Sequence, residues 1–218
     1  MAFSTKAAVM AASLAAATTL WGLPASSAES VALGYDIRKE GEPIGREQVR
    51  IVRTDDGAVV DVQTRTRAKV LFMEFRYDHS RREEWKDGKL VRMVADTDDD
   101  GTKSHLETIR SAAGWTVTVN GQSSQRDGDP LPLTLWGRAV LEKGELYSII
   151  DAKPYRVQVA SLGTETITLD GKTVSAERFR ISGDVERDLW YGVDGYLLKA
   201  AFQRSGYPIE VVRSERRP

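Results

Sequence analysis

The sequence lacks most of the side chains from which metal and thiol sites are built. It contains no cysteine and only two histidines, His79 and His105, among 218 residues. Zinc sites draw on cysteine and on closely spaced histidines, so we expect no metal and no cofactor. Because disulfide bonds are excluded, stability must come from strand pairing and from burial of apolar side chains.

The chain also lacks an excess of charge of either sign. It carries 31 basic and 32 acidic residues, for a formal net charge of −1 at pH 7. Nucleic-acid-binding surfaces need a clear basic surplus, so nucleic acid is not an expected partner. Arginines at alternating strand positions are expected on solvated faces, where they pair with carboxylates across strands.

The one extended apolar stretch lies near the N-terminus, from Ala7 to Leu23. It follows Lys6, is rich in alanine, and leads to the small residues Ser26 and Ala28. This is the pattern of a secretory signal cleaved before Glu29. The apolar stretch is shorter and less hydrophobic than that of a membrane anchor. The sequence therefore predicts a periplasmic or secreted protein that does not span the membrane after cleavage.

No linker divides the rest of the chain. We expect a signal peptide over 1–28, a single β-rich domain over 29–213 and a flexible tail over 214–218. A mature chain of this size is long enough to bury a substantial apolar core.

Asp-Gly and Asn-Gly pairs separate runs in which apolar and polar residues alternate. Such pairs tolerate the positive φ angles of tight type I′ turns, and a period of two is the signature of half-buried strands. The sequence therefore predicts consecutive antiparallel hairpins. The pairs are Asp56-Gly57, Asp87-Gly88, Asp100-Gly101, Asn120-Gly121, Asp170-Gly171 and Asp194-Gly195.

One stretch departs from the strand pattern. Pro132 interrupts strand continuity, and Trp136, Ala139 and Val140 follow at helical spacing. A large curled sheet needs an element that covers its concave face or open end. We therefore expect a mainly all-β fold, a curled antiparallel sheet that forms a half-barrel or incompletely closed barrel, with one short helix near 133–143 against its interior.

An acidic segment from Asp96 to Glu107 matches the spacing of an EF-hand calcium loop. Its flanks alternate like strands instead of showing helical faces, and Lys103 stands where an EF-hand carries an apolar residue. The pattern favours an aspartate-rich hairpin turn. Weak calcium binding at this turn stays open as an alternative.

No local motif of catalytic side chains is recognisable in the sequence. Asp78, His79 and Ser80 are adjacent, but neighbouring residues on a strand point to opposite faces, so they cannot form a triad. Glu83 and Glu84 are separated in the same way. The sequence favours a non-catalytic protein, and a hydrolase with carboxylates assembled across strands stays open as an alternative.

Large aromatic residues are the best candidates for a binding surface. Trp85, Trp136, Trp190 and Phe75 are the predicted ligand-binding residues, and Trp136 on the expected helix is the leading one. The alternative for each of them is a place in the core, where most large aromatic side chains lie.

Several segments resemble a bacterial family of exported β proteins of unknown function. Phe72 to His79, Glu84 to Leu90, Thr97 to Gly101 and Asp188 to Tyr191 carry the resemblance, which runs from about Leu33 to Val212. It implies an exported β fold and no assigned activity. In architecture, the expected fold also resembles periplasmic carriers of outer-membrane lipoproteins, which are unclosed β-barrels with a helical lid.

These observations predict an exported protein that holds an apolar ligand, such as a lipid or an acyl chain, against the concave face of the sheet. The alternative is an envelope protein that binds another protein along an open sheet edge or has a structural role there.

Overall fold

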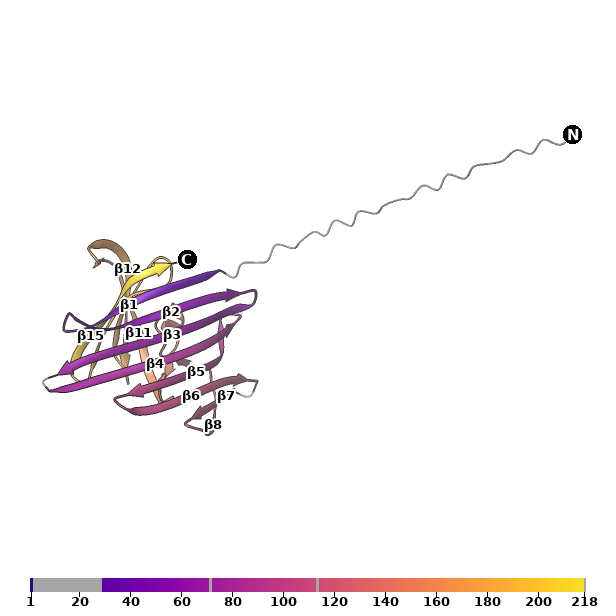
Figure 1. The fold of residues 1–218 in the computed structure, drawn as a ribbon, viewed down its shortest axis with the longest axis horizontal. Helices are drawn as coiled ribbons and strands as arrows, with labels where there is room; N and C mark the ends of the chain where they lie inside the picture. Colours follow the sequence, from indigo (N-terminus) through magenta and orange to yellow (C-terminus); the bar gives the residue numbers. More distant parts are fainter. Residues whose placement is uncertain (2–28, 71, 113, 218) are drawn as a thin grey trace.

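The computed structural model describes residues 1, 29–70, 72–112 and 114–217, so positions 2–28 of the predicted signal lie outside the described residues. The described chain folds as one sheet of 15 strands in the order β8-β7-β6-β5-β4-β3-β2-β1-β15-β14-β13-β12-β11-β10-β9. Figure 1 shows β2 to β5 side by side across the front, with the orange and yellow strands of the C-terminal half behind them.

The strands occupy almost the whole described chain. The N-terminal half contains β1 (Ser30–Lys39), β2 (Glu42–Thr54), β3 (Gly57–Val70), β4 (Met73–Lys86), β5 (Lys89–Asp99), β6 (Thr102–Ser111), β7 (Gly114–Val119) and β8 (Gln122–Arg126). The C-terminal half contains β9 (Leu131–Pro132), β10 (Glu145–Tyr147), β11 (Pro154–Leu169), β12 (Lys172–Gly183), β13 (Arg187–Tyr191), β14 (Leu197–Arg204) and β15 (Tyr207–Arg217).

Tight turns join most neighbouring strands. The pair Asp56-Gly57 forms no such turn: Gly57 already pairs with Thr54 as the first residue of β3. Glu40-Gly41 and Ser205-Gly206 make two further turns with positive φ at both residues. Four of the predicted pairs have the positive φ at both residues that a type I′ turn requires, Asp87-Gly88, Asp100-Gly101, Asn120-Gly121 and Asp170-Gly171.

The sheet curls until its two ends face each other. The end strands β8 and β9 are joined by residues 127–130 but are not neighbours in the sheet. Side chains link the two sides: the Ser104 hydroxyl donates to the carbonyl oxygen of Ile150 at 2.7 Å, and the Thr108 and Tyr147 hydroxyls lie 3.2 Å apart. The protein is therefore an incompletely closed barrel, which confirms the predicted fold class.

The short helix expected near 133–143 is a single 3-10 turn over Arg138–Glu142. The physical reason lies in the backbone acceptors, because the Tyr191 hydroxyl lies 3.2 and 3.1 Å from the carbonyl oxygens of Leu135 and Gly137. The carbonyl oxygen of Trp136, between them, accepts from the backbone N–H of Leu197 at 3.2 Å, so this segment bonds to β14 and does not form the hydrogen bonds of an α-helix. In the part of the chain that the structure describes, no helix is long and apolar enough to cross a membrane.

Apolar side chains from alternate strand positions fill the inside of the barrel. Leu33, Val60, Leu90, Leu146 and Leu189 are at most 2% exposed in this core. A second, smaller cluster lies on the other face of the C-terminal strands, where side chains of the β11–β12 hairpin meet those of β13, β14 and β15. Its buried members are Leu169, Ala176, Trp190, Leu198 and Val212.

The end of the chain, which we expected to be a flexible tail over 214–218, is part of a strand in the residues that the structure describes. Residues 214–217 continue β15, and Glu215 and Arg217 pair with Gly34 and Ala32 of β1. The run of charged side chains suggested a frayed end, but strand pairing uses the backbone, and these side chains are exposed on the strand.

Candidate functional site

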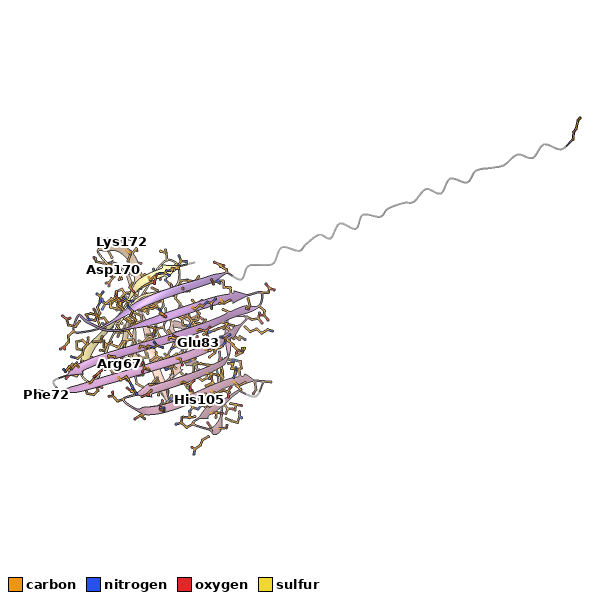
Figure 2. The ribbon with its side chains drawn as sticks, viewed as in Figure 1. Arg67, Phe72, Glu83, His105, Asp170 and Lys172 are labelled. Atoms are coloured by element: carbon orange, nitrogen blue, oxygen red, sulfur yellow. The ribbon has the colours of Figure 1, made fainter. Side chains whose placement is uncertain are left out.

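Strand β4 carries a row of polar side chains into the barrel. Because alternate residues of a strand share a face, every second residue of β4 points inward, and its neighbours point to solvent. Glu83, labelled in Figure 2, is 0% exposed and Arg81 is 7% exposed, although both carry charges. The inward residues are Tyr77, His79, Arg81, Glu83 and Trp85.

The Glu83 carboxylate is the centre of a buried hydrogen-bond network. Its Oε1 accepts from Arg81 Nε at 2.6 Å, and its Oε2 accepts from the indole nitrogens of Trp85 and Trp136, each at 2.9 Å. A buried charge is tolerated only when it is paired and hydrogen-bonded, and Glu83 meets both conditions.

Arg81 and His79 extend the network in both directions. The second arginine nitrogen, NH2, donates to the Thr134 hydroxyl at 2.7 Å, and NH1 lies 3.4 Å from Nε2 of His79. The other ring nitrogen of His79 lies 2.8 Å from the Thr97 hydroxyl. Burial and the adjacent positive charge of Arg81 lower the pKa of His79 to about 3, so the imidazole is neutral at pH 7. We call His79, Arg81, Glu83, Trp85, Thr134 and Trp136 the interior network.

The interior network connects β4 to residues 133–137, the irregular segment that precedes the 3-10 turn. Thr134 and Trp136 belong to that segment, and the Trp136 ring packs edge-on against Trp85 with centroids 5.7 Å apart. Because Glu83 accepts three N–H groups and Arg81 is its ion-pair partner, these groups are committed to structure. The network is therefore a structural clamp and does not supply a free acid or base.

A pocket of about 330 Å³ opens at one end of the barrel, between the interior network and the β14–β15 hairpin. We call it the mouth pocket. Most of its wall is apolar, and its lining includes Ile37, Ile44, Leu135, Leu197, Phe202 and Val211. Its volume lies at the lower end of the usual range for ligand sites, roughly 300–1,000 Å³.

Charged side chains also line the mouth pocket. Arg204 is paired, since it donates to Asp99 at 2.8 Å and lies 4.5 Å from the ring centroid of Tyr77. Glu47 accepts from the Thr64 hydroxyl at 2.7 Å. Arg187 enters from β13 and stacks on Phe202, with its guanidinium 4.2 Å from the ring centroid.

The four predicted aromatic residues lie in three different places. Trp85 and Trp136 meet in the interior network and line a hollow of about 250 Å³. Phe75 is 39% exposed and lines a hollow of about 360 Å³, which shares Thr66 and other residues with the mouth pocket. Trp190 lies in the smaller cluster on the other face, where its indole N–H donates to Glu165.

The acidic segment is a hairpin turn between β5 and β6, as its flanks predicted. Its carboxylates already have partners, because Asp98 pairs with Arg76 and Asp99 with Arg204, both at 2.8 Å. The Asp96 carboxylate lies 2.7 Å from the ring nitrogen Nδ1 of His105. Among the described residues, no group of three or more His, Asp or Glu side chains is placed to hold a metal ion.

Two wider hollows lie on the solvent face of the N-terminal strands, with volumes of about 850 and 820 Å³. Their walls contain cross-strand ion pairs such as Arg67 with Asp78 and Arg82 with Asp61. This confirms the expectation that arginines pair across solvated faces. Because these charges satisfy one another and lie in solvent, we favour the mouth pocket as the candidate site.

Reasoning from the sequence missed Arg187, Arg204 and the inward row of β4. Strand alternation could have grouped His79, Arg81 and Glu83, but both faces of that strand carry charge, so no apolar face identified the inside. Arg187 was missed because its pocket is formed by strands distant in the sequence.

Comparison with known proteins gives a fold and a family. A crystal structure of a beta-barrel-like protein of the domain of unknown function DUF1849 from Brucella abortus is similar, with a TM-score of 0.65 at 12% identity, over 86% of this chain and 97% of that chain. At this identity the likeness shows the fold alone. No curated protein matches the chain. The model of the domain of unknown function DUF6134 matches residues 35–214, and the chain belongs to this family.

Proposed function

We propose that the protein is an exported, non-catalytic protein of the periplasm that binds an apolar ligand, a lipid or an acyl chain, in the mouth pocket. The observation that carries the proposal is an apolar concavity of about 330 Å³ at the end of the barrel, lined by side chains of the apolar core. Burial of an apolar chain against such a wall is favourable by about 25 cal/mol per Å².

Among the described residues, the lining of the mouth pocket does not offer the two free carboxyl groups that the hydrolase alternative requires. Glu83 is fully hydrogen-bonded, and Glu47 is engaged by Thr64 at 2.7 Å. A glycosidase-type mechanism needs one carboxyl group that donates a proton and a second that acts as base or nucleophile. The geometry therefore favours binding over hydrolysis.

A partner protein at a sheet edge is the weaker alternative. The strand β8 is an end strand of the sheet, and it is short, polar and mostly exposed, with the sequence Gln-Ser-Ser-Gln-Arg. Short polar end strands are a common way to prevent edge pairing. The other end strand, β9, has two residues and both are buried.

The proposal predicts that filling the mouth pocket blocks binding of an apolar probe. Thr66 lines the pocket from β3, so Thr66→Trp should place an indole inside it. We expect the affinity for the fluorescent probe phenylnaphthylamine to fall at least roughly tenfold, equivalent to about 1.4 kcal/mol. Titration of the probe into the protein measures this directly.

The matched control is Arg65→Trp, which adds the same ring at the next residue on the solvent face, where Arg65 is exposed. We expect probe affinity to stay at the wild-type value in that variant. Native mass spectrometry of protein purified from its own envelope, followed by organic extraction, identifies the natural ligand. Equal probe binding by both variants and wild type would contradict the proposal.

A further inference from the structure

We propose that the mouth pocket selects amphiphiles with an anionic head group, and that Arg187 is the residue that binds this group. The inference rests on the proposed function and deepens it, because it names the ligand class that the pocket accepts. It is carried by a guanidinium that reaches an apolar pocket without a carboxylate partner.

The backbone register places Arg187 on the inside of the barrel. Arg187 is the first residue of β13 and pairs with Ile181, which is 0% exposed. Leu189 and Tyr191, two and four residues later on the same strand face, are also 0% exposed in the core. The guanidinium lies against the ring of Phe202, and both side chains line the mouth pocket.

Arg187 differs from the other arginines that face the inside. Arg81 is paired with Glu83, Arg204 with Asp99 and Arg138 with Glu177. Within the described part of the chain, Arg187 makes no such ion pair, and its hydrogen bond is to the carbonyl oxygen of the preceding residue at 2.6 Å.

The surroundings of Arg187 are unfavourable for an isolated charge. The side chain is half-buried, and desolvation lowers its pKa to about 10, which still leaves the guanidinium charged at pH 7. A partly desolvated cation gains most from an anion that forms charge-assisted hydrogen bonds with it. The planar guanidinium fork suits a carboxylate or a phosphate, which are the two chemistries we assign to the head group.

The other charged groups of the pocket direct an anion toward Arg187. The charges of Arg81 and Arg204 are already neutralised by Glu83 and Asp99. Glu47 lines the pocket from β2, and its carboxylate, held by Thr64, disfavours an anion at that wall. The apolar residues of the same lining are then available to contact the tail, so the pocket would bind both the head group and the tail of an amphiphile.

The test compares decanoate and decanol, which share a tail and differ in head-group charge. Each compound displaces phenylnaphthylamine from the full protein, and the readout is the Kd of each. We expect wild type to prefer decanoate and Arg187→Gln to weaken decanoate binding roughly tenfold to a hundredfold, the range for a hydrogen bond to a charged group. Decanol affinity should not change.

Arg204→Gln is the matched control, because it removes an arginine of the same pocket whose charge is already paired; we expect a much smaller loss of decanoate affinity. Arg187→Met supplies a second neutral variant of similar length if Arg187→Gln does not fold. Decyl phosphate in place of decanoate distinguishes the two head-group chemistries.

Equal affinity of wild type for decanoate and decanol, unchanged in Arg187→Gln, would overturn this inference and leave the apolar pocket standing. If neither compound nor the probe binds wild-type protein, the proposed function fails, and the inference fails with it. If the preference for decanoate is lost in Arg204→Gln but kept in Arg187→Gln, then Arg204 binds the head group, and the inference about Arg187 is overturned.

Discussion

Replacement of Glu83 by Gln is expected to destabilise the protein by about 3–5 kcal/mol, the usual effect of removing one partner of a buried ion pair. The amide can still accept hydrogen bonds from Trp85 and Trp136, but it carries no charge to balance Arg81. Arg81 is 7% exposed, so solvent cannot replace the lost partner. Because an ordinary domain is stable by only about 5–15 kcal/mol, this loss is a large fraction of the total.

The control for this prediction is the neighbouring residue. Glu84 points to the other face and pairs with Arg92 at 3.3 Å in a half-exposed position, so Glu84→Gln should cost less than about 1 kcal/mol. Urea unfolding followed by tryptophan fluorescence measures both variants. Similar losses for Glu83→Gln and Glu84→Gln would show that the interior network is not a clamp.

A double variant separates charge from packing. When Arg81→Met is combined with Glu83→Gln, both charges of the interior network are removed together, so we expect recovery of a large part of the lost stability. Buried ion pairs are often replaced by apolar residues without net loss. Failure to recover would place the effect in the hydrogen bonds that Arg81 donates to Glu83 and Thr134.

Acidification is expected to destabilise the protein through His79, by about 1.4 kcal/mol per pH unit between about pH 6.5 and about pH 3. The pKa of His79 is about 3 in the folded protein, against 6.5 for a free histidine side chain. Over this range the unfolded chain binds a proton that the folded protein excludes. The stability is therefore fully present above pH 6.5 and is lost as the pH falls.

The measurement is the free energy of unfolding at pH 7 and pH 4.5 for wild type and for His79→Gln. Glutamine can hydrogen-bond to Thr97 but does not titrate, so the variant should lose about 2–3 kcal/mol less than wild type on acidification. Carboxylates with lowered pKa values, such as Asp78 and Asp98, also lose stabilising interactions on acidification. They do so in both proteins, so their effect cancels in the difference between wild type and His79→Gln. Identical pH dependence of wild type and His79→Gln would refute the assignment.

Much of the fold could be predicted from the sequence, because its information is local. The alternation of residues and the Asp-Gly turns fix hairpins between strands that follow each other, as Asp100-Gly101 does for β5 and β6. The helix near 133–143 was reduced to one 3-10 turn because Tyr191, far away in the chain, takes up carbonyl groups of that segment. Local spacing cannot report such contacts.

The candidate site was less accessible to prediction, since it depends on what the curvature of the sheet brings together. Trp136 was expected to face the inside and does so, but it is held there by Glu83. Arg187 and Glu47 share a pocket although 140 positions separate them (187 − 47). Nothing in the local sequence around Arg187, on the short strand β13, distinguishes it from the arginines that lie on solvated faces.

The order of strands has a consequence for how the chain assembles. Within β1–β8 and within β9–β15 each strand pairs with its neighbour in sequence, β8 and β9 do not pair, and β1 and β15, from opposite ends of the domain, pair in the middle of the sheet. Two meanders can therefore form early from short-range contacts, and the seam between them is the slow, long-range step. A protein that crosses a membrane with its N-terminus first would present β1 with an unpaired edge until its last strand arrives, and during that interval it is most exposed to pairing with another chain.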